Sequence, residues 1–322
     1  MKNFIKLTAL VLTMMLVLPL SACSDTSIDS EAAYTIGICQ LVQHDAHNDA
    51  TQGFMDALNE ILPNQVKFNI QNASNEIPLC TSIVNQFIAE DVDLILANAT
   101  PALQAASAAT NDIPILGTSV TDYAIVMGIE DFNGIVGGNV SGTSDLASLD
   151  AQAKMVAEWF PDAANIGLLY CSAESNSQFQ VDGINTELEN LGYTCKYYAF
   201  TDANDLPSVL EGAIANCDVL YVPTDNTVAA CSAIIDNYCR PAGLPIIGGD
   251  EGICSSCTVA THGVDYYELG YKTGFMAARI LTGEADISAM PIEYADCSHV
   301  YNAEICAELG IIPPDGYAAI GA

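Results

Sequence analysis

From residue 34 onward, short apolar runs alternate with amphipathic segments, which predicts alternating strands and helices. Apolar runs typical of buried strands span residues 34–41, 66–70, 92–97 and 113–116. Helical spacing of apolar residues appears at 50–62 and 80–89, and Thr100-Pro101 opens a third helix with proline in a tolerated first-turn position.

The same pattern repeats in the second half of the chain. Further strands are predicted at 165–170, 194–200, 218–222, 244–247 and 258–261. One helix follows the strand at 165–170 and ends at about residue 191, and two more are predicted at 206–215 and 228–238. Two such βαβ series predict an α/β fold with two Rossmann-like lobes, each a parallel sheet covered by helices. Because ligands bind beyond the carboxyl ends of parallel strands, we expect a hinged pair of lobes with a ligand cleft between them.

The first residues have the pattern of an export signal. Lys2 and Lys6 precede a mostly apolar run at residues 7–20, which is shorter than the roughly 20 residues that a membrane span needs. Leu20-Ser-Ala-Cys23 then resembles the bacterial lipobox, in which the cysteine is lipidated. The alternative is an ordinary signal peptide followed by a chance cysteine.

We therefore expect residues 1–22 to be a lipoprotein signal peptide and Cys23 to carry the lipid. The polar residues 23–33 would form a flexible tether. The expected location is extracytoplasmic, anchored to the bacterial cell membrane through that lipid.

Composition limits the possible functions. The 300 residues from Cys23 onward suit two domains, and 51% hydrophobic residues in the whole chain are enough for substantial cores. Removing the two lysines of the signal takes the formal charge from −32 to −34 and leaves six basic residues. With so few positive charges, the protein is not expected to bind nucleic acid.

Eleven cysteines follow Cys23, and most are expected to be buried free thiols. Cys231 and Cys239 lie on one predicted helix about 12 Å apart, too far to form a disulfide. Cys254 and Cys257 would bind a metal only if the fold brought further ligands to them. His44 and His47 are the candidates for that role, but neither a metal nor a cofactor is expected.

Polar residues follow nearly every predicted strand and are the candidate ligand-binding residues. They are Gln43, His44, Thr100, Pro101, Thr121, Asp122, Ser144, Asp145, Ser175, Asn176, Ser177, Thr224, Asp225, Asn226, Asp250 and Glu251. Each taken singly is explained by capping of the next helix. Their convergence on one sheet edge favours a binding site instead.

The expected ligand carries both charges. Helix N-termini at Thr100 and at residues 175–177 favour a carboxylate, because their free amides point outward. Asp225 and Asp250 are expected to meet an ammonium group, and Gln43 and His44 to line a side-chain pocket. An amino acid is the simplest such zwitterion.

Four stretches resemble a known family. They are Ala99-Thr-Pro-Ala102, Pro223-Thr-Asp-Asn-Thr-Val228, Gly249-Asp-Glu251 and Asp265-Tyr-Tyr-Glu-Leu-Gly270, with looser matches at 139–145 and 173–177. Over nearly all of 34–316, the chain resembles ABC-transporter substrate-binding lipoproteins of the tryptophan/tyrosine type, with a periplasmic-binding-protein type I-like fold. It departs from the family at His44-Asp45, where His-Pro is common, and at His47, where an apolar residue is usual.

The resemblance implies that the protein captures an amino acid, with aromatic ones favoured, and delivers it to the permease of an ABC importer. It also implies that a helix at 265–283 returns to the first lobe and that the chain crosses again near Pro291. Three crossovers would then form the hinge. The first lobe would comprise 34–145 and about 264–286, and the second 146–263 and about 287–322.

Two other functions are considered. A ligand-sensing module for a separate receptor would need the same cleft. A small-molecule enzyme is disfavoured because the sequence contains no G-x-S-x-G, P-loop or H-E-x-x-H motif, and Gly134-Ile-Val-Gly-Gly138 lacks the Rossmann spacing.

Overall fold

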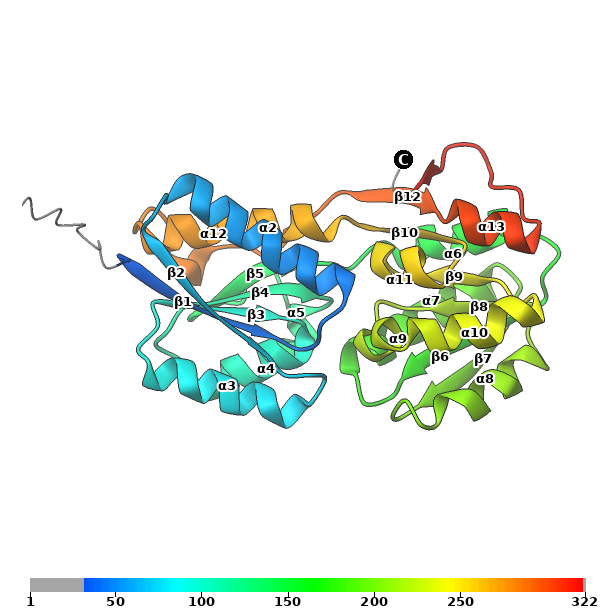
Figure 1. Cartoon of the computed structure of the whole chain (residues 1–322), viewed down its shortest axis with the longest axis horizontal. Helices are drawn as coiled ribbons and strands as arrows, with labels where there is room; N and C mark the ends of the chain where they lie inside the picture. The colour runs from blue at the N-terminus through cyan, green and yellow to red at the C-terminus, as the bar shows by residue number, and fades with distance from the viewer. Residues whose placement is uncertain (1–31, 321–322) are drawn as a thin grey trace, which may run out of the picture. The chain divides into compact units, whose positions relative to one another are not determined.

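The computed structural model describes residues 32–320, and these fold around two sheets (Figure 1). The predicted signal peptide, Cys23 and most of the tether lie outside the described residues. The first sheet has the order β11 (Glu293–Tyr294), β5 (Val140–Ser144), β4 (Ile115–Val120), β3 (Leu94–Asn98), β1 (Tyr34–Gln40) and β2 (Val66–Asn72). The second has the order β13 (Ala318–Ala319), β12 (Cys297–Tyr301), β10 (Ala260–Val264), β9 (Ile246–Gly248), β8 (Val219–Val222), β6 (Asn165–Cys171) and β7 (Thr194–Phe200).

Parallel pairing dominates both sheets. The first sheet's strands all pair in parallel, and in the second only β10 and β12 are antiparallel. The predicted α/β fold with two parallel-sheet lobes is therefore confirmed. Each sheet with its covering helices is called a lobe below.

Helices cover both faces of each sheet, so the central strands are buried. On the first sheet, α2 (Asp45–Ile61) and α12 (Tyr266–Leu281) lie on one face, and α3 (Ile77–Ala89) and α4 (Thr100–Ala109) on the other. On the second, α6 (Leu149–Trp159), α7 (Ser175–Asn190) and α13 (Ala303–Leu309) oppose α8 (Leu206–Ile214), α10 (Ser232–Ala242) and α11 (Glu251–Ser256). The short elements are α5 (Tyr123–Met127), α9 (Asn226–Ala230) and η1 (Ile287–Ala289).

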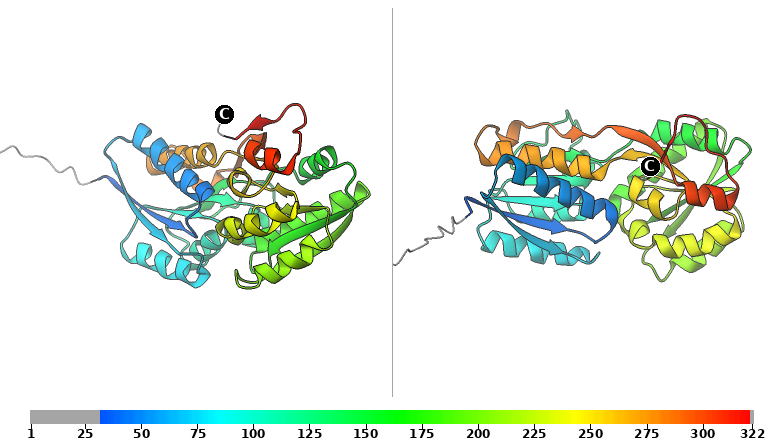
Figure 2. Two further views of the ribbon diagram at one scale, coloured as in Figure 1. Left: turned by 45° about the vertical axis from the view of Figure 1, so that its right-hand side comes forward. Right: turned by 45° about the horizontal axis from the view of Figure 1, so that its top comes forward.

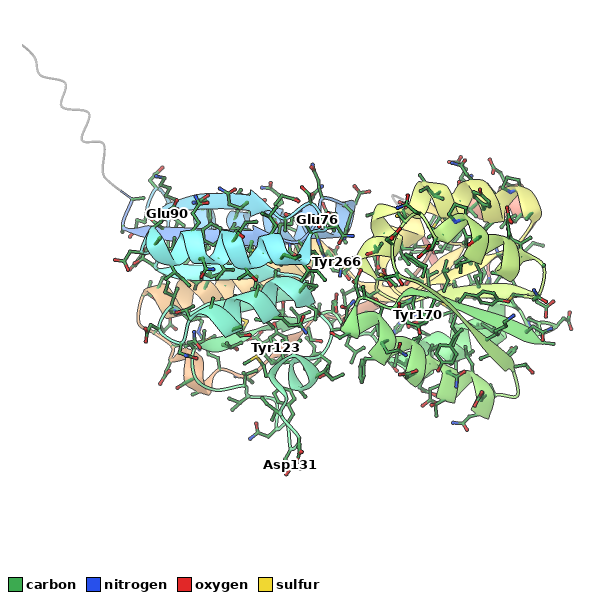
Figure 3. All side chains as sticks on the ribbon, turned by 90° about the horizontal axis from the view of Figure 1, so that it is seen from below. Glu76, Glu90, Tyr123, Asp131, Tyr170 and Tyr266 are labelled. Atoms are coloured by element: carbon green, nitrogen blue, oxygen red, sulfur yellow. The ribbon has the colours of Figure 1, made fainter. Side chains whose placement is uncertain are left out.

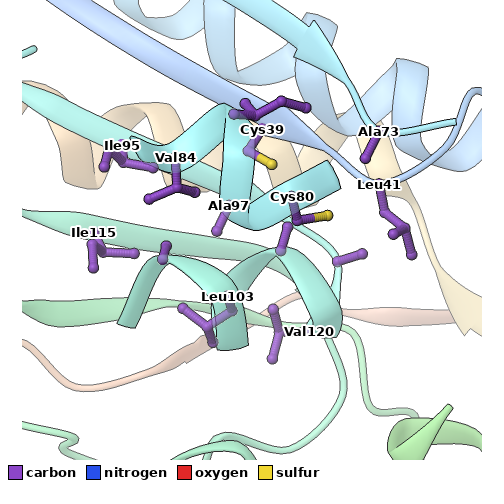
Figure 4. Close-up of a cluster of buried hydrophobic side chains, with 14 of the residues drawn as sticks. Cys39, Leu41, Ala73, Cys80, Val84, Ile95, Ala97, Leu103, Ile115 and Val120 are labelled. Atoms are coloured by element: carbon purple, nitrogen blue, oxygen red, sulfur yellow. The ribbon is translucent and has the colours of Figure 1, made fainter. Parts of the chain in front are cut away.

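The core between β1 and helix α3 shows how the cysteines are used. Cys39 on β1 and Cys80 on α3 are fully buried among aliphatic side chains such as Val84 and Ile95 (Figure 4). All eleven cysteines within residues 32–320 have free thiols. In this core the thiols pack as small apolar groups.

The chain crosses between the lobes after β5, before α12 and between β11 and β12 (Figure 2). The last crossing comes later than the expected boundary near residue 287. Residues 287–289 form η1, and Glu293 and Tyr294 pair with Thr143 and Ser144 of β5, which keeps this segment on the first sheet. The chain joins the second sheet at Cys297.

Two local predictions differ from the structure. No strand is predicted at residues 140–144, yet they form β5, which is buried between β4 and β11. The single helix expected at 228–238 is instead α9 and α10, because the backbone of Cys231 (φ −105°, ψ 9°) leaves the helical region between them.

Helices α2 and α12 pack with their backbones in contact, and glycines make this possible. A Cβ built on Gly270 would overlap the carbonyl oxygen of Ala50, and one built on Gly53 would overlap the carbonyl oxygen of Tyr267. Gly274 lies similarly against Phe54. The helix that returns from the second lobe is thereby fixed tightly to the first.

We expect Gly270→Ala to lower the free energy of unfolding by about 1–3 kcal/mol, because the helices must separate to admit the methyl group. Urea unfolding followed by circular dichroism measures this change. The control is Gly212→Ala in α8, where the added Cβ would have only an ordinary contact, 3.7 Å from the Tyr198 ring. That variant should be neutral or more stable by up to about 1 kcal/mol. Equal effects of the two substitutions would contradict the role given to the helix contact.

Candidate functional site

A small cavity of about 10 Å³ lies at the carboxyl ends of the strands, lined by residues from both lobes. Tyr266, the first residue of α12, lies where the lobes meet (Figure 3). The lining residues are His44, His47, Ser119, Thr121, Asp145, Asn176, Thr224, Asp225, Asn226, Ala229, Asp250 and Tyr266. All but Ala229 carry a polar group, so the cavity is suited to a polar or charged ligand.

Hydrogen bonds join the two lobes around this cavity. The pairs are Asn75 Nδ2 to Thr227 Oγ1 (3.1 Å), Gln180 Nε2 to Thr121 Oγ1 (3.4 Å) and Gln104 Nε2 to Ser175 Oγ (3.5 Å). A Cβ on Gly252 of α11 would lie 3.1 Å from the Ala46 methyl of α2. The lobes are therefore in direct contact on more than one side of the cavity.

Asp145 has an unused oxygen in this cavity. Its Oδ2 accepts a hydrogen bond from the Tyr266 hydroxyl at 2.9 Å, and its buried Oδ1 has no partner among the described residues. Burial raises the pKa of Asp145 to about 6. A positively charged or hydrogen-bond-donating group would remove this burial penalty.

Asp250 combines helix capping with a place in the cavity wall. Its Oδ1 accepts from the Ile253 amide at 2.8 Å, which caps α11. Burial raises the pKa of Asp250 to about 7, and the nearby charge of Asp145 adds to the effect. The two carboxylates are therefore close enough to act on the same group.

Asp225 is held more completely by the backbone. Its Oδ1 accepts from the Val228 amide at 2.8 Å and its Oδ2 from the Cys171 amide at 2.7 Å. Burial and the charge of Glu174 raise its pKa well above the usual range. Glu174, also buried, accepts hydrogen bonds from the amides of Asn226 and Thr227 at 3.1 and 2.9 Å. This network orients the N-terminus of α9.

The electrostatics of the lining favour a cationic group. Asp145, Asp225 and Asp250 are all less than 5% exposed, and no lysine or arginine is among the lining residues within 32–320. Burial in a poorly hydrated site is the common and largest cause of their raised pKa values, and the charge of Asp145 adds to the effect only at Asp250. An ammonium group between them would be strongly favoured.

Helix N-termini at this edge differ in how they are capped. Side chains of His44, Asp122, Asp225 and Asp250 cap α2, α5, α9 and α11. By contrast, α4 and α7 begin without a side-chain cap. The bond from Gln104, one turn into α4, to Ser175, the first residue of α7, links these two helices from opposite lobes. Their free amides form an environment suited to an anion.

Two of the six non-glycine residues with positive φ in the described range lie at this edge of the first sheet. Ala99 has φ of 106°, and Ser119 has φ of 54° at a register shift between β4 and β5. The Ser119 hydroxyl is buried in the cavity wall without a partner among residues 32–320. Strain of this kind persists only where the surrounding structure enforces it, and it is enriched at functional sites.

Comparison with known proteins identifies the family. The profile of the family described as ABC transporter substrate binding protein matches residues 35–319. The chain belongs to this family. Its members are solute-binding proteins, not enzymes. The Tyrosine-binding protein of Clostridioides difficile (strain R20291) is 36% identical over 274 residues, covering 83% of this chain and 78% of that relative.

Solved structures agree with this family and with the type I periplasmic-binding-protein-like fold. An ABC domain from Streptococcus pneumonia in complex with L-Trp is 28% identical, with a TM-score of 0.84 over 90% of this chain and 100% of that one. A substrate-binding protein with adhesive properties from Clostridium difficile, in a ligand-free, open structure, is 35% identical, with a TM-score of 0.68 over 89% and 99%. The substrate-binding protein described here thus matches the ligand complex better than the open structure, despite its lower identity to that complex.

Half of the sixteen predicted site residues line the cavity. They are His44, Thr121, Asp145, Asn176, Thr224, Asp225, Asn226 and Asp250. Four more, Thr100, Pro101, Ser175 and Ser177, lie in the first turns of α4 and α7 beside it.

The other four have different surroundings. Gln43 is exposed and outside the lining, because β1 ends before it and its side chain points to solvent. Asp122 caps α5, and Ser144 donates to the Thr121 carbonyl at 2.8 Å. Glu251 accepts from the Ser298 hydroxyl at 2.6 Å on the β12 side, away from the cavity.

Several residues that matter were not predicted for the site. His47, Ser119, Ala229 and Tyr266 line the cavity. Glu174 does not line it but accepts from the Thr227 amide at the start of α9, which holds the neighbouring cavity residues in place. His47 lies one helical turn after His44, so its spacing was a usable signal. Ser119 offers none, because its position depends on a local register shift.

Within residues 32–320, no cluster of three or more His, Cys, Asp or Glu side chains has a geometry that would hold a metal ion. None of the helices in that same range is both long and apolar enough to cross a membrane.

We expect Asp250→Asn to stabilise the unliganded protein at pH 8 by on the order of 2–4 kcal/mol and to change little at pH 4.5. The folded-state pKa of about 7 exceeds the unfolded value, so burying the charge destabilises the fold progressively as pH rises from about 4 to 7. Asparagine keeps an oxygen that caps α11. Urea unfolding at the two pH values measures this. An effect independent of pH would show that packing, rather than charge, is responsible.

Proposed function

We propose that this substrate-binding protein captures an amino acid between its lobes and delivers it to an ABC importer. The observation that carries the proposal is the buried, unpartnered Oδ1 of Asp145, in a cavity with two more carboxylates and beside two uncapped helix starts. Such a site satisfies both charges of a zwitterion. The cavity of about 10 Å³ holds roughly one water molecule, so the lobes must separate to admit an amino acid.

The ammonium group of the ligand binds Asp145 and Asp250. Asp145 has a free buried oxygen, and Asp250 uses one oxygen as a cap and keeps the other. Asp225 contributes negative charge, but both of its oxygens already accept backbone amides. This modifies the expectation from sequence, which paired Asp225 with Asp250.

The carboxylate of the ligand binds where α4 and α7 begin. Asn176, in the first turn of α7, lines the cavity, and the Ser119 hydroxyl is an unused donor nearby in the lining. Free amides at the starts of both helices add favourable partial charges. Because these helices belong to different lobes, the bound anion would hold the lobes together.

Among amino acids, an aromatic one is favoured. This rests on the relatives: one is named for tyrosine binding and another is a complex with L-Trp. The match of this chain to the L-Trp complex, with a TM-score of 0.84, supports a ligand in the same place.

The two-lobed architecture explains how the protein would close on its ligand and deliver it to the permease. The first lobe comprises the sheet from β2 to β11 with α12, and the second comprises the sheet from β7 to β13. The three crossovers act as the hinge, and the closed lobes present one surface to the permease. Substrate-binding proteins of ABC importers work outside the cytoplasm, and here lipidation of Cys23 anchors the protein to the membrane.

We expect Asp145→Asn and Asp250→Asn each to weaken binding of L-tyrosine or L-tryptophan by about 30- to several-thousand-fold, corresponding to about 2–5 kcal/mol. The buried ammonium would lose a charged partner while the side-chain shape is kept. Isothermal titration calorimetry measures the affinities, after mass spectrometry of the ligand released by denaturing the purified protein.

The matched control is Asp122→Asn. Asp122 caps α5 through Oδ1, 2.9 Å from the Ile125 amide, but lies outside the cavity lining. The affinity of the Asp122→Asn variant for the same amino acid should stay within threefold of that of the parent protein. If all three variants bind alike, Asp145 and Asp250 do not bind the ammonium group of the ligand. A released ligand that is a sugar or another uncharged solute would refute the amino-acid proposal.

Anchoring is tested separately. We expect Cys23→Ser to move the protein from the membrane to the soluble extracytoplasmic fraction and to abolish incorporation of labelled palmitate, because the thiol is the point of lipid attachment. Cell fractionation and fluorography report both effects. A variant that remains in the membrane fraction would show that something other than Cys23 holds it there.

A further inference from the structure

Two histidines on the first turn of α2 form part of the cavity wall in contact with each other. The rings of His44 and His47 have centroids 4.0 Å apart, with an interplanar angle of 34°. The four histidines of the chain form two such pairs, and the other, His262 with His299, spans β10 and β12 outside the cavity lining. The proposed contacts to the charged groups of the ligand do not use the cavity pair.

The hydrogen bonds of these rings fix where each proton lies. His47 Nδ1 lies 3.1 Å from the Val42 carbonyl oxygen, which only accepts, so Nδ1 carries the proton and Nε2 is an acceptor. His44 Nδ1 accepts from the His47 amide at 3.5 Å, so the proton of neutral His44 is on Nε2. The pair thus offers one donor, His44 Nε2–H, and one acceptor, His47 Nε2.

Both rings are neutral at physiological pH. Burial lowers the pKa of His44 to about 4, against a smaller opposing effect of the Asn226 side chain. Burial, together with the neighbouring His44, lowers the pKa of His47 well below its usual value. His44 Nε2 is also buried without a hydrogen-bond partner among the described residues. A buried donor of this kind destabilises the site unless a ligand satisfies it.

We propose that the His44–His47 pair recognises a hydroxyl group on the side chain of the ligand. A hydroxyl accepts from His44 Nε2–H and donates to His47 Nε2 through one oxygen atom. The assignment rests on the proposed capture of an amino acid at this cavity. It narrows the ligand to a hydroxyl-bearing amino acid and makes this pair the specificity-determining element.

Other side-chain chemistries fit the pair less well. A carboxylate only accepts, so it would leave His47 Nε2 unpaired, and it would face the charges of Asp145 and Asp225 across the cavity. A purely apolar side chain would leave both nitrogens unpaired. Asn226 lies beside both rings, and its Nδ2 donates to Glu174 at 2.5 Å, which leaves its Oδ1 as a second acceptor for the hydroxyl proton.

Calorimetry with amino acids that differ by one hydroxyl tests the proposal. L-tyrosine is compared with L-phenylalanine, and L-threonine with the isosteric L-valine. We expect the hydroxyl-bearing member of the better-bound pair to bind about 5- to 150-fold more tightly, because its partner leaves a buried polar group unsatisfied. Preferences within threefold for both pairs, in a protein that does bind amino acids, would overturn this inference and leave the proposed function intact. Binding of L-tryptophan but of none of these four would overturn this inference alone, and binding of none of the five would overturn both.

Variants of His44 and His47 test whether these two residues recognise the hydroxyl group. His44→Asn keeps a side chain that caps α2 but removes the ring donor, and His47→Phe keeps a ring but removes the acceptor. Each should bring the preference for the hydroxyl to within threefold, whereas the control His299→Phe should keep it. If either cavity variant fails to fold, the ring ¹⁵N shifts of the parent give the same information. The proposal is supported if the ¹⁵N signals show protons on His44 Nε2 and His47 Nδ1 and these signals shift on adding L-tyrosine but not on adding L-phenylalanine. Signals that neither amino acid shifts would overturn it.

Discussion

The backbone contact between α2 and α12 is the constraint on which the rest of the site depends. Gly270 meets Ala50 and Gly274 meets Phe54, so the two helices run in the same direction at a distance that only glycine permits. Both helices therefore begin at the same end of the first lobe. The histidine pair at the start of α2 and Tyr266 at the start of α12 reach one cavity for this reason. Since α12 follows a crossover, the same contact couples the second lobe to the first.

Charge burial links ligand binding to closure of the lobes. Asp145 comes from the first lobe and Asp250 from the second, and the pKa of each is raised by burial. Bringing them together without a cation is unfavourable, because each charge has lost solvent and faces another of the same sign. A ligand ammonium between the two carboxylates would replace their mutual repulsion with attraction to a positive charge. Under the proposed function, an ammonium group would therefore favour the closed arrangement, which would give a basis for selecting zwitterions over neutral solutes.

The sequence was most informative where periodicity and strand ends determine position. Apolar runs predicted the strands that build both sheets, and the polar residues after them include Asp145, Asp225 and Asp250 of the cavity. It was least informative where position depends on tertiary context. Ser119 enters the cavity through a register shift, and Glu174 acts through amides of α9 that lie about fifty residues later in the chain. Neither property has a local signature.

Counting oxygens separates helix capping from ligand binding at this edge of the sheets. A carboxylate has two oxygens, and capping a helix needs only one of them. Asp225 uses both on backbone amides, so its geometry is explained by the fold alone. Asp250 uses one for its cap, and Asp145 keeps a buried oxygen with no partner in the described part of the chain. Backbone amides therefore account for both oxygens of Asp225, for one oxygen of Asp250 and for neither oxygen of Asp145. A buried oxygen that the fold leaves unsatisfied is where a ligand is needed.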